Sequence, residues 1–134
     1  TEEVFGPSSV AIIAKDMDEL TECILHLKGQ LTASLHGTAD ELKNAGVLVD
    51  LLQEKAGRLC INAFPTGVEV GNAMVHGGPY PATSDSRTTS VGTQAIYRFT
   101  RPFCYQEFPD HLLPDALKES NPLQISRLVN GIRL

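Results

Sequence analysis

Apolar residues recur with helical spacing in two stretches of the first half of the chain. In the first stretch, Asp16 and Glu19 form an N-terminal capping pattern and Gly29 lies just beyond the last apolar residue. The apolar positions that share one face of this stretch are Met17, Leu20, Ile24 and Leu27. The pattern predicts an amphipathic helix between Asp16 and Gly29.

The second stretch has the same organisation and is longer. Thr38 and Glu41 form another capping box, and Gly57 follows the last apolar position. The residues that line one face here are Leu42, Ala45, Val49, Leu52 and Ala56. We therefore expect one continuous amphipathic helix in this part of the chain.

Short apolar runs before, between and after these helices are strand candidates. Residues 10–14 are continuously apolar, as in a strand covered on both faces, residues 31–35 alternate, and residues 59–64 form a third run. Strands separated by helices need crossover connections, and such connections produce parallel pairing. The pattern predicts an α/β fold whose first part is a βαβαβ portion of a parallel sheet.

Regular periodicity ends after the third strand candidate. Residues 65–90 are rich in Gly, Pro, Ser and Thr, and a loop of this length in a compact domain is usually functional. A third amphipathic segment follows, with Val91, Ala95, Ile96 and Phe99 on one face, and residues 103–106 could form another short strand. We expect residues 1–106 to form part of one domain, and residues 107–134 to form an irregular tail of short helical turns that packs on a larger body.

Composition excludes several classes of protein. The chain has 134 residues, the size of one domain, and 11 Lys and Arg against 16 Asp and Glu give a net charge of −5. Without a basic stripe, nucleic acid is not an expected partner, and the apolar runs are far shorter than a membrane span. Three Cys without a C-x-x-C spacing argue against a disulfide framework and favour a reducing, cytoplasmic compartment.

Motifs for nucleotides, metals and nucleophiles are missing from the sequence. Neither a G-x-G-x-x-G nor a P-loop pattern occurs, and the four His are too scattered to predict a metal site. Cys23 and Cys60 belong to apolar patterns and are expected in the core, while Cys104 has only Arg101 nearby to make its thiol more reactive. No catalytic nucleophile is predicted in this chain.

The long loop carries the strongest candidate for a binding site. The stretch VHGGPYPATSDSR, residues 75–87, combines a Gly pair with hydroxyl groups, Asp85 and Arg87, which together could line a polar pocket. The alternative is a solvated loop in which Asp85 and Arg87 pair with each other. The sequence leaves these two interpretations open.

The opening stretch EEVFGP, residues 2–7, resembles the E-E-[IV]-F-G-P motif of the aldehyde dehydrogenase superfamily. The βαβαβ order, the stretch GRLCIN at residues 57–62 and the Gly-rich loop are in register with that family up to about Phe103. Residues 62–93 resemble more narrowly the branch of α-ketoglutarate semialdehyde (2,5-dioxovalerate) dehydrogenases and related NADP-linked fatty aldehyde dehydrogenases. The loop departs from the superfamily pattern, because His76 replaces a Phe and the usual Lys is missing.

This resemblance implies a mechanism for a longer protein. In the family a Cys thiolate attacks the aldehyde, hydride passes to NAD or NADP, and a Glu activates the water that releases the acid. The family's nicotinamide contacts carry over to Glu3, which would hold the ribose hydroxyls, and to Phe5, which would pack beside the ring. The nucleophile, the base and the cofactor domain precede this motif in the family, so the chain is expected to be its C-terminal quarter.

Two interpretations of function follow. In the first, the chain is an inactive fragment of a dehydrogenase that oxidises a semialdehyde, foremost 2,5-dioxovalerate to 2-oxoglutarate, with Arg87 or Ser84 and Ser86 binding the substrate's distal carboxylate. Its expected partners are the aldehyde, the remainder of the same enzyme and further copies in a homo-oligomer. It would also expose an unpaired sheet edge and apolar helix faces. The alternatives are a free-standing, non-catalytic α/β binding module and a fatty aldehyde dehydrogenase fragment.

Overall fold

The computed structural model describes residues 5–134, so Glu3 of the opening motif lies outside the described residues. The chain divides into two compact units, one that ends at Thr100 and one from Arg101 to Leu134. The elements of the first unit are α1 (Met17–Leu25), β1 (Ala33–Leu35), α2 (Ala39–Lys43), α3 (Gly46–Lys55), β2 (Leu59–Ile61) and the 3₁₀ helix η1 (Thr93–Phe99). Those of the second are η2 (Asp110–Leu112), β3 (Leu128–Val129) and β4 (Ile132–Arg133).

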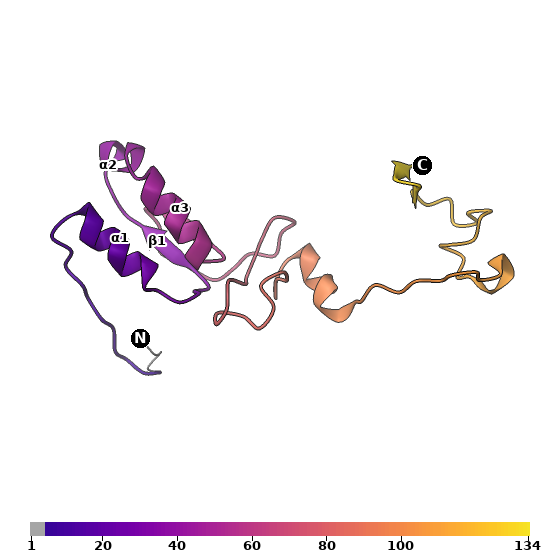
Figure 1. Cartoon of the computed structure of the whole chain (residues 1–134), viewed down its shortest axis with the longest axis horizontal. Helices are drawn as coiled ribbons and strands as arrows, with labels where there is room; N and C mark the ends of the chain where they lie inside the picture. Colours follow the sequence, from indigo (N-terminus) through magenta and orange to yellow (C-terminus); the bar gives the residue numbers. More distant parts are fainter. Residues whose placement is uncertain (1–4) are drawn as a thin grey trace. The chain divides into compact units, whose positions relative to one another are not determined.

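The first unit is built on a β-α-α-β arrangement (Figure 1). Strands β1 and β2 are parallel, with Ser34 opposite Cys60, and the pairing extends backwards through a bridge between Gln30 and Ala56. The helices α2 and α3 form the crossover that a parallel pair requires. The predicted α/β class is confirmed, although both strands are shorter than the apolar runs that predicted them.

Helix α1 forms where the spacing predicted it. The Asp16 side chain accepts a hydrogen bond of 2.9 Å from the Glu19 N–H, which satisfies one of the free donors in the first turn. The Glu19 carboxylate accepts a bond from the Lys15 N–H rather than from that of Asp16, so the return bond of the capping box is displaced by one residue.

The single helix expected after Thr38 is instead two helices. The predicted capping box is present, because the Thr38 side chain accepts from the Glu41 N–H and the Glu41 carboxylate accepts from the Thr38 N–H. The chain then breaks between α2 and α3, where the Asn44 amide donates to the Asp40 carbonyl and Gly46 begins the next helix. An Asn side chain that takes a main-chain carbonyl competes with the helical backbone, which explains the interruption.

The core of the first unit is small and lies between α1, α3 and one face of the sheet. Ile24, Leu48 and Leu52 are its centre, and Leu48 is only 4% exposed. Ala33, Leu35 and Leu59 meet this cluster from the strands. Figure 1 shows α1 and α3 beside β1. The apolar periodicity of the sequence therefore identified part of the buried face. It missed the central Leu48, and it included Met17 and Leu27, which are 54% and 40% exposed.

Two predicted strands are wrong in this structure. Residues 10–14 form no strand, and Val10 and Ile13 are almost fully exposed. Residues 103–106 are likewise without regular structure. A strand needs a neighbour for its N–H and C=O groups, and within residues 5–134 the parallel sheet contains β1 and β2 alone. An apolar run without a pairing partner therefore stays an irregular extended segment.

The segment after the long loop also differs from the prediction. Residues 93–99 form the 3₁₀ helix η1, and Ile96 and Phe99 are exposed instead of lying on a buried face. Short helical turns do occur in the tail, as expected, in η2. The hairpin of β3 and β4 was not predicted. Among residues 5–134, no helix is long and apolar enough to cross a membrane.

Candidate functional site

The long loop docks on the parallel strands through glycine backbone. A Cβ atom on Gly57 would lie closer than 3.0 Å to backbone atoms of Gly77 and Gly78, and one on Gly29 equally close to Pro79 and Tyr80. Gly29 and Gly57 immediately precede Gln30 and Arg58, at the amino ends of the paired segments. The predicted role of the Gly pair in close backbone approach is therefore observed.

A buried threonine ties the two limbs of this loop together. The Thr89 hydroxyl accepts a hydrogen bond of 2.8 Å from the His76 N–H and donates one of 2.8 Å to the Val91 carbonyl. The Ser90 N–H and hydroxyl both donate to the His76 carbonyl at 3.0 Å. Because buried polar groups need partners, these bonds to Thr89, which is 4% exposed, favour this conformation of the loop.

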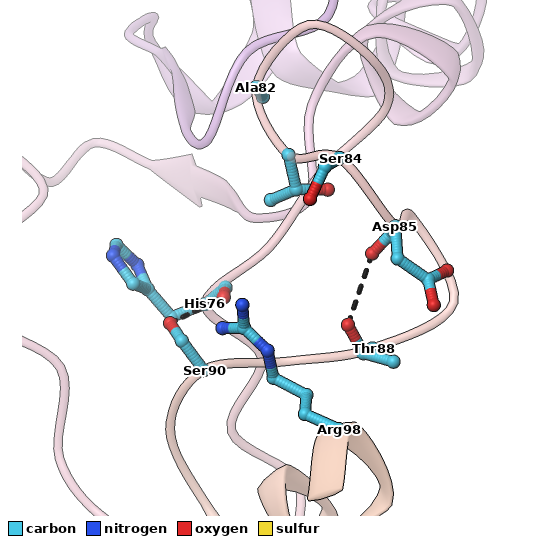
Figure 2. A pocket seen from close by; sticks show the side chains of 8 residues that line it. His76, Ala82, Ser84, Asp85, Thr88, Ser90 and Arg98 are labelled. Carbon is cyan, nitrogen blue, oxygen red and sulfur yellow. Dashed lines mark hydrogen bonds between the residues drawn. The ribbon is translucent and has the colours of Figure 1, made fainter. Parts of the chain in front are cut away.

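These constraints shape a polar cavity of about 210 Å³ within the first unit (Figure 2). The side chains that line it are His76, Ala82, Thr83, Ser84, Asp85, Thr88, Ser90 and Arg98. In Figure 2 the Arg98 guanidinium rises from η1 toward the centre, and the Ser84 hydroxyl points toward the same space from the opposite side. The Asp85 carboxylate points away from the centre.

Most hydroxyl protons of the cavity are already used. Thr83 donates to the Gly78 carbonyl at 2.7 Å, Thr88 to that of Asp85 at 3.1 Å, and Ser90 to that of His76. By contrast, no hydrogen bond or ion pair within residues 5–134 engages the side chain of Ser84 or of Arg98. Together with the ring of His76, which also lines the cavity without a hydrogen-bond partner among residues 5–134, these two groups are its free donors.

The pairing of Asp85 with Arg87, which the sequence left open as an alternative, is present. Arg87 Nε lies 3.2 Å from Asp85 Oδ1, and the Arg87 N–H donates to the same oxygen at 3.0 Å. These two hydrogen bonds hold the pKa of Asp85 below its usual value, and the charges of Arg87 and, more weakly, Arg98 act in the same direction. The Asp85 carboxylate is therefore neutralised by its own loop.

The three residues proposed from sequence to bind substrate have different positions. Ser84 lines the cavity, whereas Ser86 and Arg87 are exposed and outside its lining. Arg98, which does line it, was missed because it lies 11 residues after Arg87 on a segment expected to be an ordinary amphipathic helix. In the sequence, the charged Arg98 between Tyr97 and Phe99 indicates that this segment is not a core helix. Both aromatic side chains are exposed in the structure.

A second group of side chains gathers at the carboxyl ends of the two strands. Asn62 follows β2 with a φ of 49°, and its amide makes two bonds of 2.9 Å with the N–H and C=O of Gly37 beyond β1. The rings of His36 and Phe64 lie 4.9 Å apart beside this clamp. In parallel sheets ligands usually bind at the carboxyl ends of the strands. The Gly-rich loop docks at the opposite, amino ends.

The remaining sequence candidates are placed as follows. Phe5 is 95% exposed, so its ring face is free to contact a ligand, and Glu3 lies outside the described residues. Cys23 and Cys60 are half-buried, and Cys104 is exposed. Within residues 5–134, no three His, Cys, Asp or Glu side chains are arranged to hold a metal ion.

The sequence is similar to curated proteins along nearly its whole length. It is 57% identical over 129 residues to alpha-ketoglutaric semialdehyde dehydrogenase 2 of Azospirillum brasilense, which is 96% of this chain and 25% of that protein. It is 58% identical over 130 residues to alpha-ketoglutaric semialdehyde dehydrogenase of Acinetobacter baylyi, which is 97% of this chain and 25% of that protein.

No protein-family model matches the chain. The chain spans about a quarter of the length of the curated relatives that it matches. More than half of the residues are identical over almost the whole chain, which confirms the resemblance drawn from the EEVFGP motif and the Gly-rich loop. The chain is therefore similar, over nearly its whole length, to a portion about a quarter in length of the aldehyde dehydrogenase superfamily proteins that it matches.

Proposed function

We propose that this chain is the C-terminal part of the catalytic domain of an NAD(P)-dependent aldehyde dehydrogenase. The complete protein would oxidise a semialdehyde, foremost 2,5-dioxovalerate to 2-oxoglutarate. The observation that carries this proposal is the identity of 57–58% with two alpha-ketoglutaric semialdehyde dehydrogenases over 96–97% of the chain. The chain alone is expected to be inactive, because in the superfamily the nucleophilic Cys and the cofactor domain precede the matched motif.

The exposed apolar surface of the first unit supports a larger assembly. Val10, Ile12 and Ile13 stand exposed on an extended segment, and the outer edges of β1 and β2 carry no further strand within residues 5–134. Apolar runs and open edges of this kind are normally covered by other protein. The remainder of the same enzyme, and further copies in a cytoplasmic homo-oligomer, are the proposed partners.

The residues available for the cofactor agree with a partial site. The exposed ring of Phe5 can pack against a nicotinamide, and a carboxylate such as Glu3 can accept hydrogen bonds from two ribose hydroxyls. NAD or NADP supplies the hydride acceptor when bound. What this chain would contribute is orientation, since fixing a reacting group in place accelerates a reaction without any chemistry by the side chain itself. The choice between NAD and NADP would be made near the adenine ribose, in sequence outside this chain.

The proposed substrate contacts are the polar groups of the loop. Ser84, Ser86 and Arg87 are proposed to assist in binding the distal carboxylate of the semialdehyde, because hydroxyls and a guanidinium suit that group. For Arg87 this requires that a substrate compete with Asp85, which holds the guanidinium at 3.2 Å in this structure. A substrate carboxylate would therefore gain less from Arg87 than from an unpaired cation.

The proposed function is tested by comparing two proteins. The gene that encodes this chain should be expressed with all of its upstream coding sequence, and the 134-residue chain should be expressed alone. We expect aldehyde-dependent NAD(P)H formation from the longer protein with 2,5-dioxovalerate and none from the short chain. Turnover by the pure short chain would contradict the proposal, as would a longer protein that oxidises fatty aldehydes but no semialdehyde.

A binding measurement separates the proposal from a free-standing module. The short chain offers the cofactor only Glu3 and Phe5, so calorimetry should detect no NAD or NADP binding at millimolar concentration. Clear binding by the short chain would favour a binding module that works without the rest of an enzyme. A catalytically active longer protein would then be needed to retain the dehydrogenase proposal.

A further inference from the structure

The size of the Gly-rich loop cavity limits what it can bind. Pockets for complete small-molecule ligands usually have volumes of about 300–1,000 Å³. The present cavity, at about 210 Å³, is smaller than that range but far larger than the roughly 30 Å³ that one water occupies. It can therefore hold the polar end group of a ligand together with a few waters, but not a whole dinucleotide.

The hydrogen-bonding capacity of the lining favours a ligand that accepts hydrogen bonds. The hydroxyls of Thr83, Thr88 and Ser90 have given their protons to main-chain carbonyls. The groups that still offer protons are the Arg98 guanidinium, with five N–H donors in a planar fork, the Ser84 hydroxyl and the ring N–H of His76. A cation and a hydroxyl that point into one space match the geometry of a carboxylate or a phosphate oxygen.

The nearby acid does not cancel this preference. Asp85 is engaged by the backbone and side chain of Arg87, and its carboxylate points away from the centre in Figure 2. Arg87 therefore neutralises Asp85 and leaves Arg98 as the unpaired positive charge of the lining. The two arginines have different roles, although only Arg87 lies within the stretch that the sequence singled out.

We propose that this cavity is a binding site for a small oxyanion, a carboxylate or phosphate group, held by Arg98 and Ser84. The inference deepens the proposed function, on which the identity of the ligand rests. The carboxylate would belong to the oxo-acid that is substrate or product, and the phosphate would belong to a phosphorylated cofactor. Because Arg98 is exposed to solvent, the site should be weak when isolated and should weaken further with salt.

The test is a titration of the 134-residue chain followed by nuclear magnetic resonance, at constant ionic strength. 2-Oxoglutarate and inorganic phosphate are the two probes, and sodium chloride replaces them in the reference titration. We expect saturable shifts of the Ser84 and Arg98 amide signals with a dissociation constant of about 1 mM or weaker. Tighter binding of 2-oxoglutarate assigns the site to a carboxylate, and tighter binding of phosphate assigns it to a phosphate.

Variants connect the binding to the proposed residues. Arg98→Gln should weaken binding at least about tenfold, because hydrogen bonds to a charged group are worth more than neutral ones. Ser84→Ala should weaken it less, without changing the charge. Lys43→Gln, which removes a positive charge from α2 that pairs with Asp40, is the matched control and should bind like the native chain. Circular dichroism checks that each variant keeps its helices.

Three results would overturn the proposal. The first is no saturable shift with either probe at about 10 mM. The second is equal binding by Arg98→Gln and Lys43→Gln, which would show that the anion responds to the net charge of the chain and not to a site at Arg98. The third is loss of binding in Arg87→Gln but not in Arg98→Gln. Failure of the proposed function appears separately, as absence of aldehyde oxidation by the longer protein, and leaves these binding results intact.

Discussion

The β-α-α-β core and the Gly-rich loop lie in the same unit but are held together by different kinds of contact. In the core, Ile24, Leu48 and Leu52 bury their side chains between two helices and a parallel pair of strands. In the loop, the buried groups at the docking point are Gly77 and Gly78, which have no side chains, and they meet the backbone around Gly29 and Gly57. The core is stabilised by apolar burial, and the loop by close fit of main chain.

This difference has a consequence for dynamics. Removing apolar surface from water is favourable by about 25 cal/mol per Å², so the core should unfold as one cooperative body. The loop buries little apolar surface and depends on a few hydrogen bonds around Thr89 and on steric fit. Segments of this kind open at lower free energy than the core. The loop should therefore be able to detach while the helices persist.

The largest effect is expected from Leu48→Ala in the core. Leu48 is 4% exposed, and truncating a buried Leu removes transfer free energy and leaves a cavity, typically at a cost of about 2–5 kcal/mol. We expect both the helices and the loop to lose protection together, because the loop docks on the strands that this core supports. Urea unfolding followed by circular dichroism, with hydrogen exchange for the loop amides, measures both.

The adjacent residue provides the control for that change. Val47 is 66% exposed on the same helix, so Val47→Ala removes a similar apolar group from solvent-facing surface and should change the free energy of unfolding by less than about 0.5 kcal/mol. Equal destabilisation by the two substitutions would show that the small cluster is not the stabilising core.

An intermediate effect is expected from Gly57→Ala at the docking point. The new Cβ would collide with backbone atoms of Gly77 and Gly78, and main chain cannot rotate away as a flexible side chain can. Overpacking of this kind costs about 1–3 kcal/mol. The loop should relieve it by detaching, so hydrogen exchange of the His76 and Ser90 amides, which are bonded across the loop, should accelerate while the helical circular dichroism stays unchanged.

Gly46→Ala is the matched substitution, because a Cβ there meets nothing within 4 Å. It places Ala in the first turn of α3, where it should be neutral or stabilise by up to about 1 kcal/mol. If Gly57→Ala instead lowers helix content as much as it frees the loop, the two regions unfold as one, and the contrast between them fails.

The fold could be predicted where local chemistry determines it. Asp16 and Thr38 cap the helices that the spacing indicated, and Ala45, Leu52 and Ala56 are buried as their periodicity required. The Asn130-Gly131 turn of the β3–β4 hairpin has both residues at positive φ, and Asn-Gly is a local sequence signature of such a turn. Predictions failed where a partner was needed, as in residues 10–14, since local pattern cannot supply a neighbouring strand.

The candidate site shows the same limit. The sequence identified the loop and the use of its Gly pair for close approach, and it offered the Asp85–Arg87 pair as one of two alternatives. It did not indicate that Arg87 would lie outside the cavity and that Arg98 would line it. The position of Arg98 depends on how η1 returns toward the loop, which a local pattern does not determine. Likewise, the hydrogen bonds between Asn62 and Gly37 join residues 25 positions apart, so a local sequence pattern does not predict them.

The smallest effect is expected from acid titration of the capping box in the core region. Hydrogen bonds from the Thr38 N–H, and then from its hydroxyl, hold the pKa of Glu41 below its ordinary value of 4.5. A lowered carboxyl pKa contributes stability that is full above about pH 4.5 and is lost as the pH falls through the folded-state value. Unfolding midpoints measured between about pH 3 and pH 7 should therefore decline at the acid end.

Two substitutions separate Glu41 from the other acids. Glu41→Gln keeps a side chain that can accept the Thr38 bonds but no longer titrates, so its share of the acid decline should vanish. Thr38→Val removes the hydroxyl and keeps the N–H, so the pKa of Glu41 should rise part of the way toward its ordinary value. The remaining decline should then be smaller and should end at a higher pH. Because this box belongs to the core region, loop exchange at Ser90 should follow the decline only as far as the helices themselves unfold. If Glu41→Gln and the native chain lose stability in parallel down to about pH 3, the acid response comes from other carboxylates, and the capping box stabilises α2 without contributing to the pH dependence.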